Sequence, residues 1–195
     1  SFTALQAGIS AKGFPMEGRI YKIEPDAVEK VLNEGVVAVV TGFQAVTDDG
    51  DVITLGRGGS DLSAVALAAS LGAESCQLLK DVTGIMTGDP RVVEKPRKLT
   101  TLGFDECMEM TVQGAKVLQE RSVELAARYN VPLYVGSSFV EEEVTGVMGN
   151  PVTEGLVIKS VIHDTKAAKI VLLGVPDIPG VAARLFSDLA DVGIG

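Results

Sequence analysis

The sequence contains no tryptophan, a single histidine and two cysteines, and aromatic residues make up only 5% of its 195 residues. The cysteines, Cys76 and Cys107, lack the short spacing of zinc-binding pairs, and His163 has no second histidine to join it. We therefore expect no metal site built from protein side chains. His163 follows apolar residues that favour a strand, and we expect it on the surface rather than in catalysis. So few cysteines favour a reducing compartment, for which the cytoplasm is the simplest expectation.

Long apolar runs and an excess of basic residues are also missing. No apolar run approaches the length of a membrane span, and the N-terminus lacks the pattern of a signal peptide. Seventeen basic residues against 26 acidic ones give a net charge of −9, which argues against nucleic acid or an anionic membrane as partner. With 46% hydrophobic and 22% charged residues, the composition is that of a globular protein.

The two ends of the sequence do not coincide with the ends of predicted elements. Ser1 is not an initiator methionine, and residues 1–9 show no clear start of a helix or strand. Residues 192–195 stop where a new strand would begin. These features favour the interpretation that the sequence is a fragment.

A glycine-rich stretch, Thr54–Asp61 (TLGRGGSD), lies between a predicted strand and a predicted helix that ends near Gly72. We expect Ser60 or Asp61 to cap this helix. Backbone amides at a helix start favour an anion, Arg57 adds a planar fork of donors, and Asp61 adds a carboxylate. Together they predict a site for a charged small molecule, and a capped turn with an exposed arginine is the alternative. The stretch is neither a Walker loop nor a G-x-G-x-x-G motif.

The rest of the first 150 residues alternates between strand and helix patterns. Residues 10–18 and 80–97 read as loops. Residues 36–40 (VVAVV) are a continuous apolar run, typical of a strand buried on both faces. Further strands are expected at residues 19–23, 76–79 and 131–135, and helices at 26–34, 104–110 and 115–129.

This alternation predicts an α/β fold with a mostly parallel sheet sandwiched by helices. A turn at residues 48–50 predicts a hairpin. Ligands of parallel sheets bind beyond the carboxyl ends of the strands, where Phe43, Arg57 and the 80–97 loop would meet. The acidic residues 141–143 are expected to form a solvated edge.

A second unit is predicted from residue 155 to residue 195. Strands are expected at residues 156–162 and 168–175, followed by a turn and a helix over 181–191, which makes an incomplete α+β unit. Pro179 stiffens the turn, Gly180 permits close approach of a ligand, and the helix start at Val181 offers amides to a carboxylate. Asp177 is placed to meet an α-amino group. An amino acid carries both charges on one carbon and would match both partners, but from these residues alone a plain proline-glycine turn with Asp177 as a cap is the better interpretation.

Several motifs, in this order, resemble those of aspartokinases within the amino acid kinase fold, and together they cover nearly the whole chain. The C-terminal motif resembles the turn that opens an ACT regulatory domain. The resemblance identifies residues 1–150 as the C-terminal part of an amino acid kinase domain and residues 155–195 as the beginning of an ACT-like domain. The motifs are Thr54–Asp61, Asp81–Ile85 (DVTGI), Thr87–Arg91 (TGDPR), Gly114–Leu118 (GAKVL), Val131–Leu133, Ser137–Phe139 and Gly174–Ala182 (GVPDIPGVA).

The resemblance implies phosphorylation of the side-chain carboxylate of L-aspartate by ATP with Mg²⁺, giving 4-phospho-L-aspartate. This is the first step of lysine, threonine and methionine biosynthesis, and lysine or threonine would act as effector. It also implies a homo-oligomer formed through ACT units. By resemblance, catalysis falls to Asp61 and Lys116, aspartate binding to Phe43, Arg57 and Ser60, nucleotide binding to Lys80, Asp81, Met86, Arg91, Lys116 and Val117, and effector binding to Asp177, Pro179, Gly180 and Val181.

The sequence departs from the family pattern at several positions. Lys80 stands where threonine is usual, Met86 where tyrosine is common, and Gln119-Glu120 where His-Pro is usual. The family's N-terminal Lys-Phe-Gly-Gly strand, with a catalytic lysine, does not occur in these residues, so residues 1–195 alone are expected to be inactive. Two alternatives stay open: another amino acid kinase acting on glutamate, acetylglutamate or a nucleotide, and a non-catalytic amino-acid-binding regulatory module.

Overall fold

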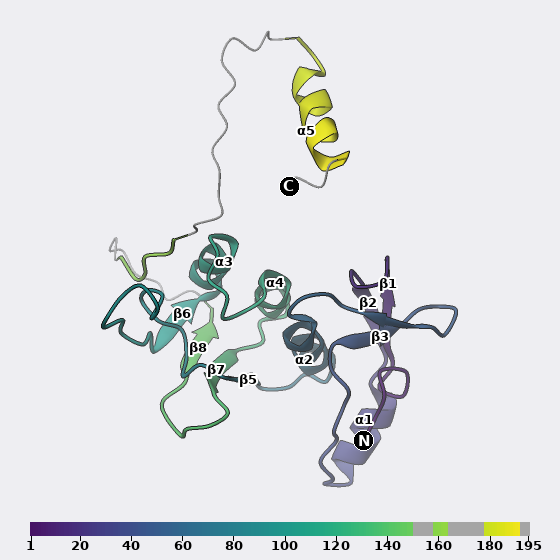
Figure 1. Cartoon of the computed structure of the whole chain (residues 1–195). Coiled ribbons are helices and arrows are strands. Elements are labelled where there is room, and N and C mark those ends of the chain that lie inside the picture. Colours follow the sequence, from purple (N-terminus) through teal and green to yellow (C-terminus); the bar gives the residue numbers. More distant parts are fainter. Residues whose placement is uncertain (150–157, 164–177, 192–195) are drawn as a thin grey trace. The chain divides into compact units, whose positions relative to one another are not determined.

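The computed structural model describes residues 1–149, 158–163 and 178–191, and the chain divides into two units, Ser1–Asp164 and Thr165–Gly195 (Figure 1). The described part of the first unit contains two four-stranded sheets. In the first, the strand order is β2-β1-β3-β4, and in the second it is β5-β7-β8-β6. None of the helices in the described ranges is long and apolar enough to cross a membrane.

The first sheet is built around β1 (Ile9–Lys12), where the sequence predicted a loop. Ile9 and Ala11 are buried, whereas Ser10 and Lys12 are more exposed, so burial alternates along the strand. The polar residues of this short segment led to the prediction of a loop. β1 pairs antiparallel with β2 and parallel with β3, and β3 pairs antiparallel with β4 across the predicted hairpin turn. The remaining strands are β2 (Arg19–Ile23), β3 (Gln44–Val46) and β4 (Val52–Thr54).

The second sheet also mixes the two kinds of pairing. β5 and β7 are parallel, β6 and β8 are parallel, and β7 and β8 are antiparallel. The predicted α/β class is therefore confirmed, but both sheets contain antiparallel pairs in addition to the expected parallel ones. The short strands β6 and β8 carried too few residues for their period to be visible in the sequence. The strands are β5 (Cys76–Lys80), β6 (Thr101–Gly103), β7 (Leu133–Ser137) and β8 (Thr145–Met148).

Four helices occur in the described part of the first unit, and two of them begin differently from the prediction. α2 is capped by Gly58, whose φ of +71° is left-handed, so neither Ser60 nor Asp61 is the cap. α4 begins at Glu120 rather than at 115, because the side chain of Gln119 accepts a hydrogen bond from the amide of Ser122. The helices are α1 (Asp26–Asn33), α2 (Gly59–Ser70), α3 (Phe104–Val112) and α4 (Glu120–Tyr129).

The apolar run at residues 36–40 is not the doubly buried strand that we predicted. Val37 is 84% exposed and Val39 is 63% exposed. The run has one bridge partner in the described structure, where the amide of Phe2 donates to the carbonyl of Val39 over 2.7 Å. A strand buried on both faces needs neighbours along both edges, and a single bridge does not supply them.

Two hydrophobic clusters form the core of the first unit, and α2 contributes to both. Val65 packs in the cluster of the second sheet, which includes Leu133 and Val147. Leu62 packs in the cluster of the first sheet, which includes Ile9. One helix therefore links the two sheets, and its N-terminal turn is the glycine-rich stretch.

The described part of the second unit consists of residues 178–191. The predicted helix is confirmed as α5 (Val181–Asp191), and it follows Gly180, which has a φ of +94°. Residues 158–162, where a strand was predicted, are not in a strand. The predicted strand at 168–175 and the predicted effector residue Asp177 lie outside the described residues.

Candidate functional site

The glycine-rich turn packs tightly against Phe43 on one side and Gln119 on the other. A Cβ added at Gly58 would lie 2.5 Å from Cβ of Gln119, and one at Gly59 would lie 3.0 Å from the Phe43 ring. Gly58 must therefore stay a glycine both for its positive φ and for its contact with Gln119. Arg57 is exposed, and its guanidinium makes no hydrogen bond or ion pair with any residue of the described structure.

Phe43 is fixed against the first turn of α2 by a short chain of hydrogen bonds. Its amide donates to Oγ of Ser63 over 3.1 Å, and that hydroxyl donates to the carbonyl of Ser60 over 3.0 Å. The Phe43 carbonyl accepts from the amide of Leu55 over 3.0 Å. The structure thus gathers the three predicted aspartate-binding residues at one turn. Ser63 binds the backbone of two of them, Phe43 and Ser60. The sequence analysis did not single it out, because a serine at this position of a predicted helix carries no distinguishing pattern.

Asp61 and Lys80 form an ion pair that joins α2 to the carboxyl end of β5. The ammonium of Lys80 lies 2.7 Å from Oδ2 and 3.0 Å from Oδ1 of Asp61. The Asp61 side chain is 13% exposed and that of Lys80 is 22% exposed, so the pair is partly shielded from water. Charge-assisted bonds of this length are strong and directional. The sequence analysis assigned Lys80 to nucleotide binding by resemblance and did not predict its ion pair with Asp61.

Hydrogen bonds between the two ends of the 80–97 loop, and the buried hydroxyl of Thr145, hold the loop in place. The amide of Leu99 donates to the carbonyl of Ile85, and the amide of Thr87 donates to the carbonyl of Arg97, each over 2.8 Å. Oγ1 of Thr145 accepts from the Ile85 amide over 2.9 Å and donates to the Leu99 carbonyl over 2.6 Å. Thr145 is fully buried. This long loop is therefore a fixed structure at the end of β5.

Arg91 is already engaged by a carboxylate within the same loop. Its Nε donates to Oδ1 of Asp89 over 3.0 Å, and its Nη2 donates to Oδ2 over 2.7 Å. The hydrogen bonds from Arg91 hold the pKa of Asp89 at about 2. A phosphate that binds Arg91 would compete with Asp89 for the same planar fork.

Asp81, Lys116 and Val117 differ in how accessible they are. Asp81 and Lys116 are exposed, and neither makes a hydrogen bond or ion pair with another described residue. Val117 is half-buried against the core of the second sheet. Residues 115–119 are not helical, so Lys116 precedes α4 instead of lying in it. This segment reaches the turn through the contact between Gln119 and Gly58.

The residues available here fit a magnesium nucleotide better than a metal held by protein alone. The described residues contain no group of three or more His, Cys, Asp or Glu side chains placed to hold a metal ion. Mg²⁺ at phosphoryl-transfer sites is held by substrate phosphates with one or two carboxylates, for which Asp81 is exposed at the end of β5. The exposed ammonium of Lys116 suits phosphate oxygens.

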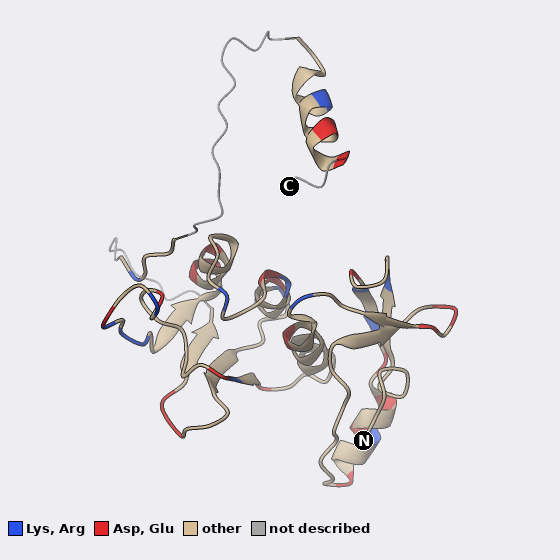
Figure 2. Ribbon diagram, in the orientation of Figure 1, with Lys and Arg blue, Asp and Glu red and all other residues tan. Residues whose placement is uncertain are grey.

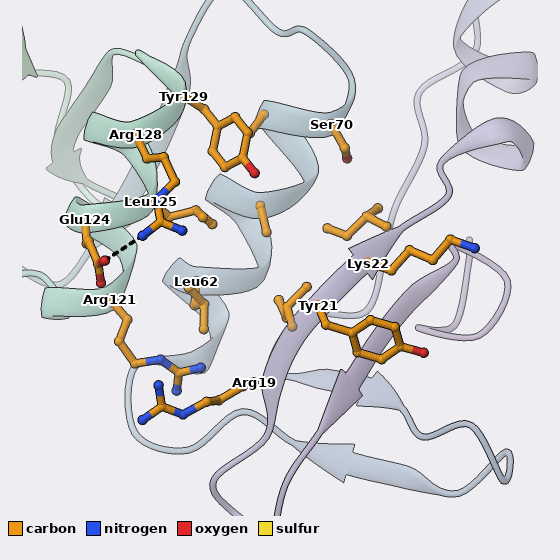
Figure 3. A pocket seen from close by; sticks show the side chains of 14 residues that line it. Arg19, Tyr21, Lys22, Leu62, Ser70, Arg121, Glu124, Leu125, Arg128 and Tyr129 are labelled. Carbon is orange, nitrogen blue, oxygen red and sulfur yellow. Dashed lines mark hydrogen bonds and ion pairs between the residues drawn. The ribbon is translucent and has the colours of Figure 1, made fainter.

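Arg121, which the sequence analysis did not single out, ties α4 to the strand that leads into the turn. Its Nη1 donates to the carbonyl of Leu55 over 3.1 Å, and its Nη2 donates to the carbonyl of Gly18 over 2.9 Å. Arg121 also lines a cavity of about 450 Å³ between β2, α2 and α4, which Phe43, Arg57 and Asp61 do not line (Figure 3). The residues predicted to bind aspartate therefore do not share this cavity.

Comparison with known proteins identifies the fold. Residues 1–137 match the amino acid kinase family. The chain belongs to this family. Over its full length it is 45% identical to the aspartokinase of Mycobacterium tuberculosis, covering 47% of that protein. It is also 42% identical to the aspartokinase of Thermus thermophilus, with 99% of this chain and 48% of that protein covered. This amino acid kinase chain thus spans about half the length of the curated relatives it matches.

Solved structures agree with this assignment. Escherichia coli aspartokinase III in complex with aspartate and ADP (R-state) matches all of this chain with a TM-score of 0.75 and 29% identity, over 45% of its own chain. The complex of the same enzyme with lysine and aspartate (T-state) matches 98% of this chain with a TM-score of 0.66 and 28% identity, again over 45% of its own chain. These matches confirm the resemblance to aspartokinases and the α/β fold.

Proposed function

We propose that this chain supplies the substrate turn and nucleotide loop of an aspartate kinase. The reaction transfers the γ-phosphoryl group of ATP to the side-chain carboxylate of L-aspartate. A carboxylate oxygen forms a bond to the γ-phosphorus, the bond to the β–γ bridging oxygen breaks, and ADP leaves with 4-phospho-L-aspartate as product. The Asp61–Lys80 ion pair at the glycine turn carries the proposal, because it joins the turn of Phe43, Arg57 and Ser60 to the loop after β5. The identity to aspartokinases and the aspartate–ADP complex of the E. coli enzyme support it.

Aspartate binding is assigned to Arg57, Phe43 and Ser60. The unpaired guanidinium of Arg57 is suited to hold the α-carboxylate with two parallel hydrogen bonds, which leaves the side-chain carboxylate free to attack. The Phe43 ring lies close to Gly59 in the same turn. Ser60 lies in the first helical turn, where free amides favour a negative charge.

Phosphoryl transfer depends on positioning and on positive charge more than on covalent chemistry. Asp61 holds the ammonium of Lys80, and Lys116 is exposed and available to phosphate oxygens. When bound, ATP with Mg²⁺ supplies the phosphoryl group and the leaving group. The nucleotide positions are Lys80, Asp81, Met86, Arg91, Lys116 and Val117.

The proposed activity is tested by transplanting residues 1–195 into a relative. A chimera in which they replace the matching segment of M. tuberculosis aspartokinase is expected to form aspartyl hydroxamate from aspartate, ATP and hydroxylamine. Residues 1–195 alone are expected to form none, because this chain spans about half of that relative. A folded chimera that accepts glutamate but not aspartate would overturn the proposed substrate, and one that binds aspartate and ADP without turnover would favour a binding module. Product from residues 1–195 alone would contradict the expected inactivity.

We further propose that the reaction opens lysine, threonine and methionine biosynthesis and is inhibited by lysine or threonine at the turn that includes Asp177, Pro179, Gly180 and Val181. The observed helix start at Val181 after Gly180 supports the site, as does the complex of the E. coli enzyme with lysine. Pairing of C-terminal units would make the protein a homo-oligomer.

In the chimera, Asp177→Ala is expected to raise the half-inhibitory concentration of the effector about tenfold, since one charged hydrogen bond to the α-amino group is lost. The uninhibited kcat should not change. Titrations of lysine and threonine at fixed aspartate and ATP measure this. An unmoved half-inhibitory concentration in an inhibited chimera would remove Asp177 from the effector site.

A further inference from the structure

The cavity between β2, α2 and α4 concentrates positive charge in a protein whose net charge is −9. Four basic side chains line it, against the single carboxylate of Glu124. Figure 2 shows acidic residues elsewhere, at the tip of the β3–β4 hairpin and in the segment before β8. The basic residues of the cavity are Arg19, Lys22, Arg121 and Arg128.

Two of these positively charged side chains lie close to one another. Figure 3 shows the guanidinium groups of Arg19 and Arg121 side by side at one end of the cavity. Burial lowers the pKa of Arg121, the positive charge of Arg19 lowers it further, and the carboxylate of Glu124 opposes this shift in part. Since arginine stays charged in proteins, the two groups repel each other. An anion between them would offset this repulsion.

The hydrogen bonds of the cavity leave Arg19 open to a ligand. Arg128 is paired with Glu124 over 3.0 Å, and Lys22 is paired with Glu24 over 2.9 Å. Arg121 uses Nη1 and Nη2 for backbone carbonyls, which fixes the plane of its guanidinium. Arg19 is exposed, and its side chain makes no hydrogen bond or ion pair within the described residues. The guanidinium of Arg19 therefore has free donors for an oxyanion, and the fixed Arg121 adds a second positive charge beside it.

The rest of the cavity wall suits a small organic body. Leu62, Ala66 and Ala69 of α2 contribute apolar lining. Tyr129, at the end of α4, also lines the cavity, and its ring lies near Ser70 (Figure 3). A volume of about 450 Å³ falls within the range of small-molecule sites.

We propose that this cavity binds a small-molecule oxyanion with two or more negative charges, held between Arg19 and Arg121. Its charged group is a phosphate or a dicarboxylate, and its body lies over α2. The site is separate from the glycine turn and does not depend on the proposed kinase activity.

Binding to the 195-residue chain is measured by calorimetry with inorganic phosphate, pyrophosphate and succinate at constant ionic strength, with NaCl as reference. At least one probe should bind, and Arg19→Gln should weaken it about tenfold, the effect of losing one charge-assisted pair. Lys30→Gln on α1 makes the same charge change at an exposed position outside the cavity and should leave the Kd unchanged. Binding of the phosphates alone identifies a phosphorylated ligand, and binding of succinate alone identifies a dicarboxylate.

Arg57→Gln separates this cavity from the glycine turn and should not change the Kd of the probe. The proposal is overturned if no probe binds more tightly than chloride, if Arg19→Gln and Lys30→Gln weaken binding equally, or if Arg57→Gln abolishes it. Arg121 is left intact because it supports two backbone carbonyls. None of these results depends on phosphoryl transfer, so a failure of the kinase assignment would be visible separately.

Discussion

Asp61→Asn is expected to lower kcat in the chimera about 100-fold or more, the size of effect seen when one preorganised electrostatic group is lost from a transition state. Asparagine keeps the shape of the side chain but loses the charge that holds Lys80 at 2.7 Å and 3.0 Å. The Lys80 side chain, which is 22% exposed, would then be free to turn toward water and away from Asp61. Initial rates of aspartyl hydroxamate formation at saturating aspartate and ATP measure the loss.

A matched control separates catalysis from stability. Glu142→Gln removes the partner of Lys98, whose side chain is also 22% exposed, at a site away from the glycine turn. This variant is expected to keep kcat within about twofold, because Glu142 is 53% exposed, against 13% for Asp61, and pairs with an exposed partner contribute little. Lys80→Met should resemble Asp61→Asn, and the double variant should be no worse than either single one if the two residues act as a unit. If Asp61→Asn lowers the melting temperature but leaves kcat unchanged, the pair is only structural.

Arg57→Lys is expected to raise the KM for aspartate about 10- to 100-fold, while the KM for ATP changes little. Lysine keeps the positive charge but cannot form two parallel hydrogen bonds to one carboxylate. Arg57 has no partner within the described structure, so the substitution breaks no internal contact and should not alter stability. Steady-state kinetics of the chimera, varying aspartate and ATP in turn, test this.

Arg97→Lys is a suitable control for this experiment, because Arg97 is exposed and its hydrogen bonds with Thr87 are made through its backbone. It should leave the KM for aspartate unchanged. If Arg57→Lys moves the KM for ATP instead of that for aspartate, the turn binds the nucleotide. Unchanged kinetics for both substrates would remove Arg57 from the site.

Much of the candidate site was visible in the sequence because its signals are local. Residues 52–70 form a strand, a glycine turn and a helix in direct succession. This segment contains Arg57, Ser60 and Asp61 within five consecutive positions. The order of the other motifs then indicated the amino acid kinase family, which the comparison of residues 1–137 confirms. Such motifs are recognised from the spacing of residues along the chain, so they can be identified before the fold is known.

Tertiary structure decided the contacts between distant residues. Asp61 and Lys80 are 19 residues apart, and Arg121 reaches a carbonyl 66 residues away, so no local period predicts either contact. The exposure of Val37 shows that an apolar run does not by itself predict burial. Burial depends on neighbouring elements from other parts of the chain. The sequence alone therefore determined which residues carry the charge at the turn. The packing of β5 and α4 against α2 decided which partners those residues meet, because pairing across the sheets and helices sets distances that spacing along the chain does not.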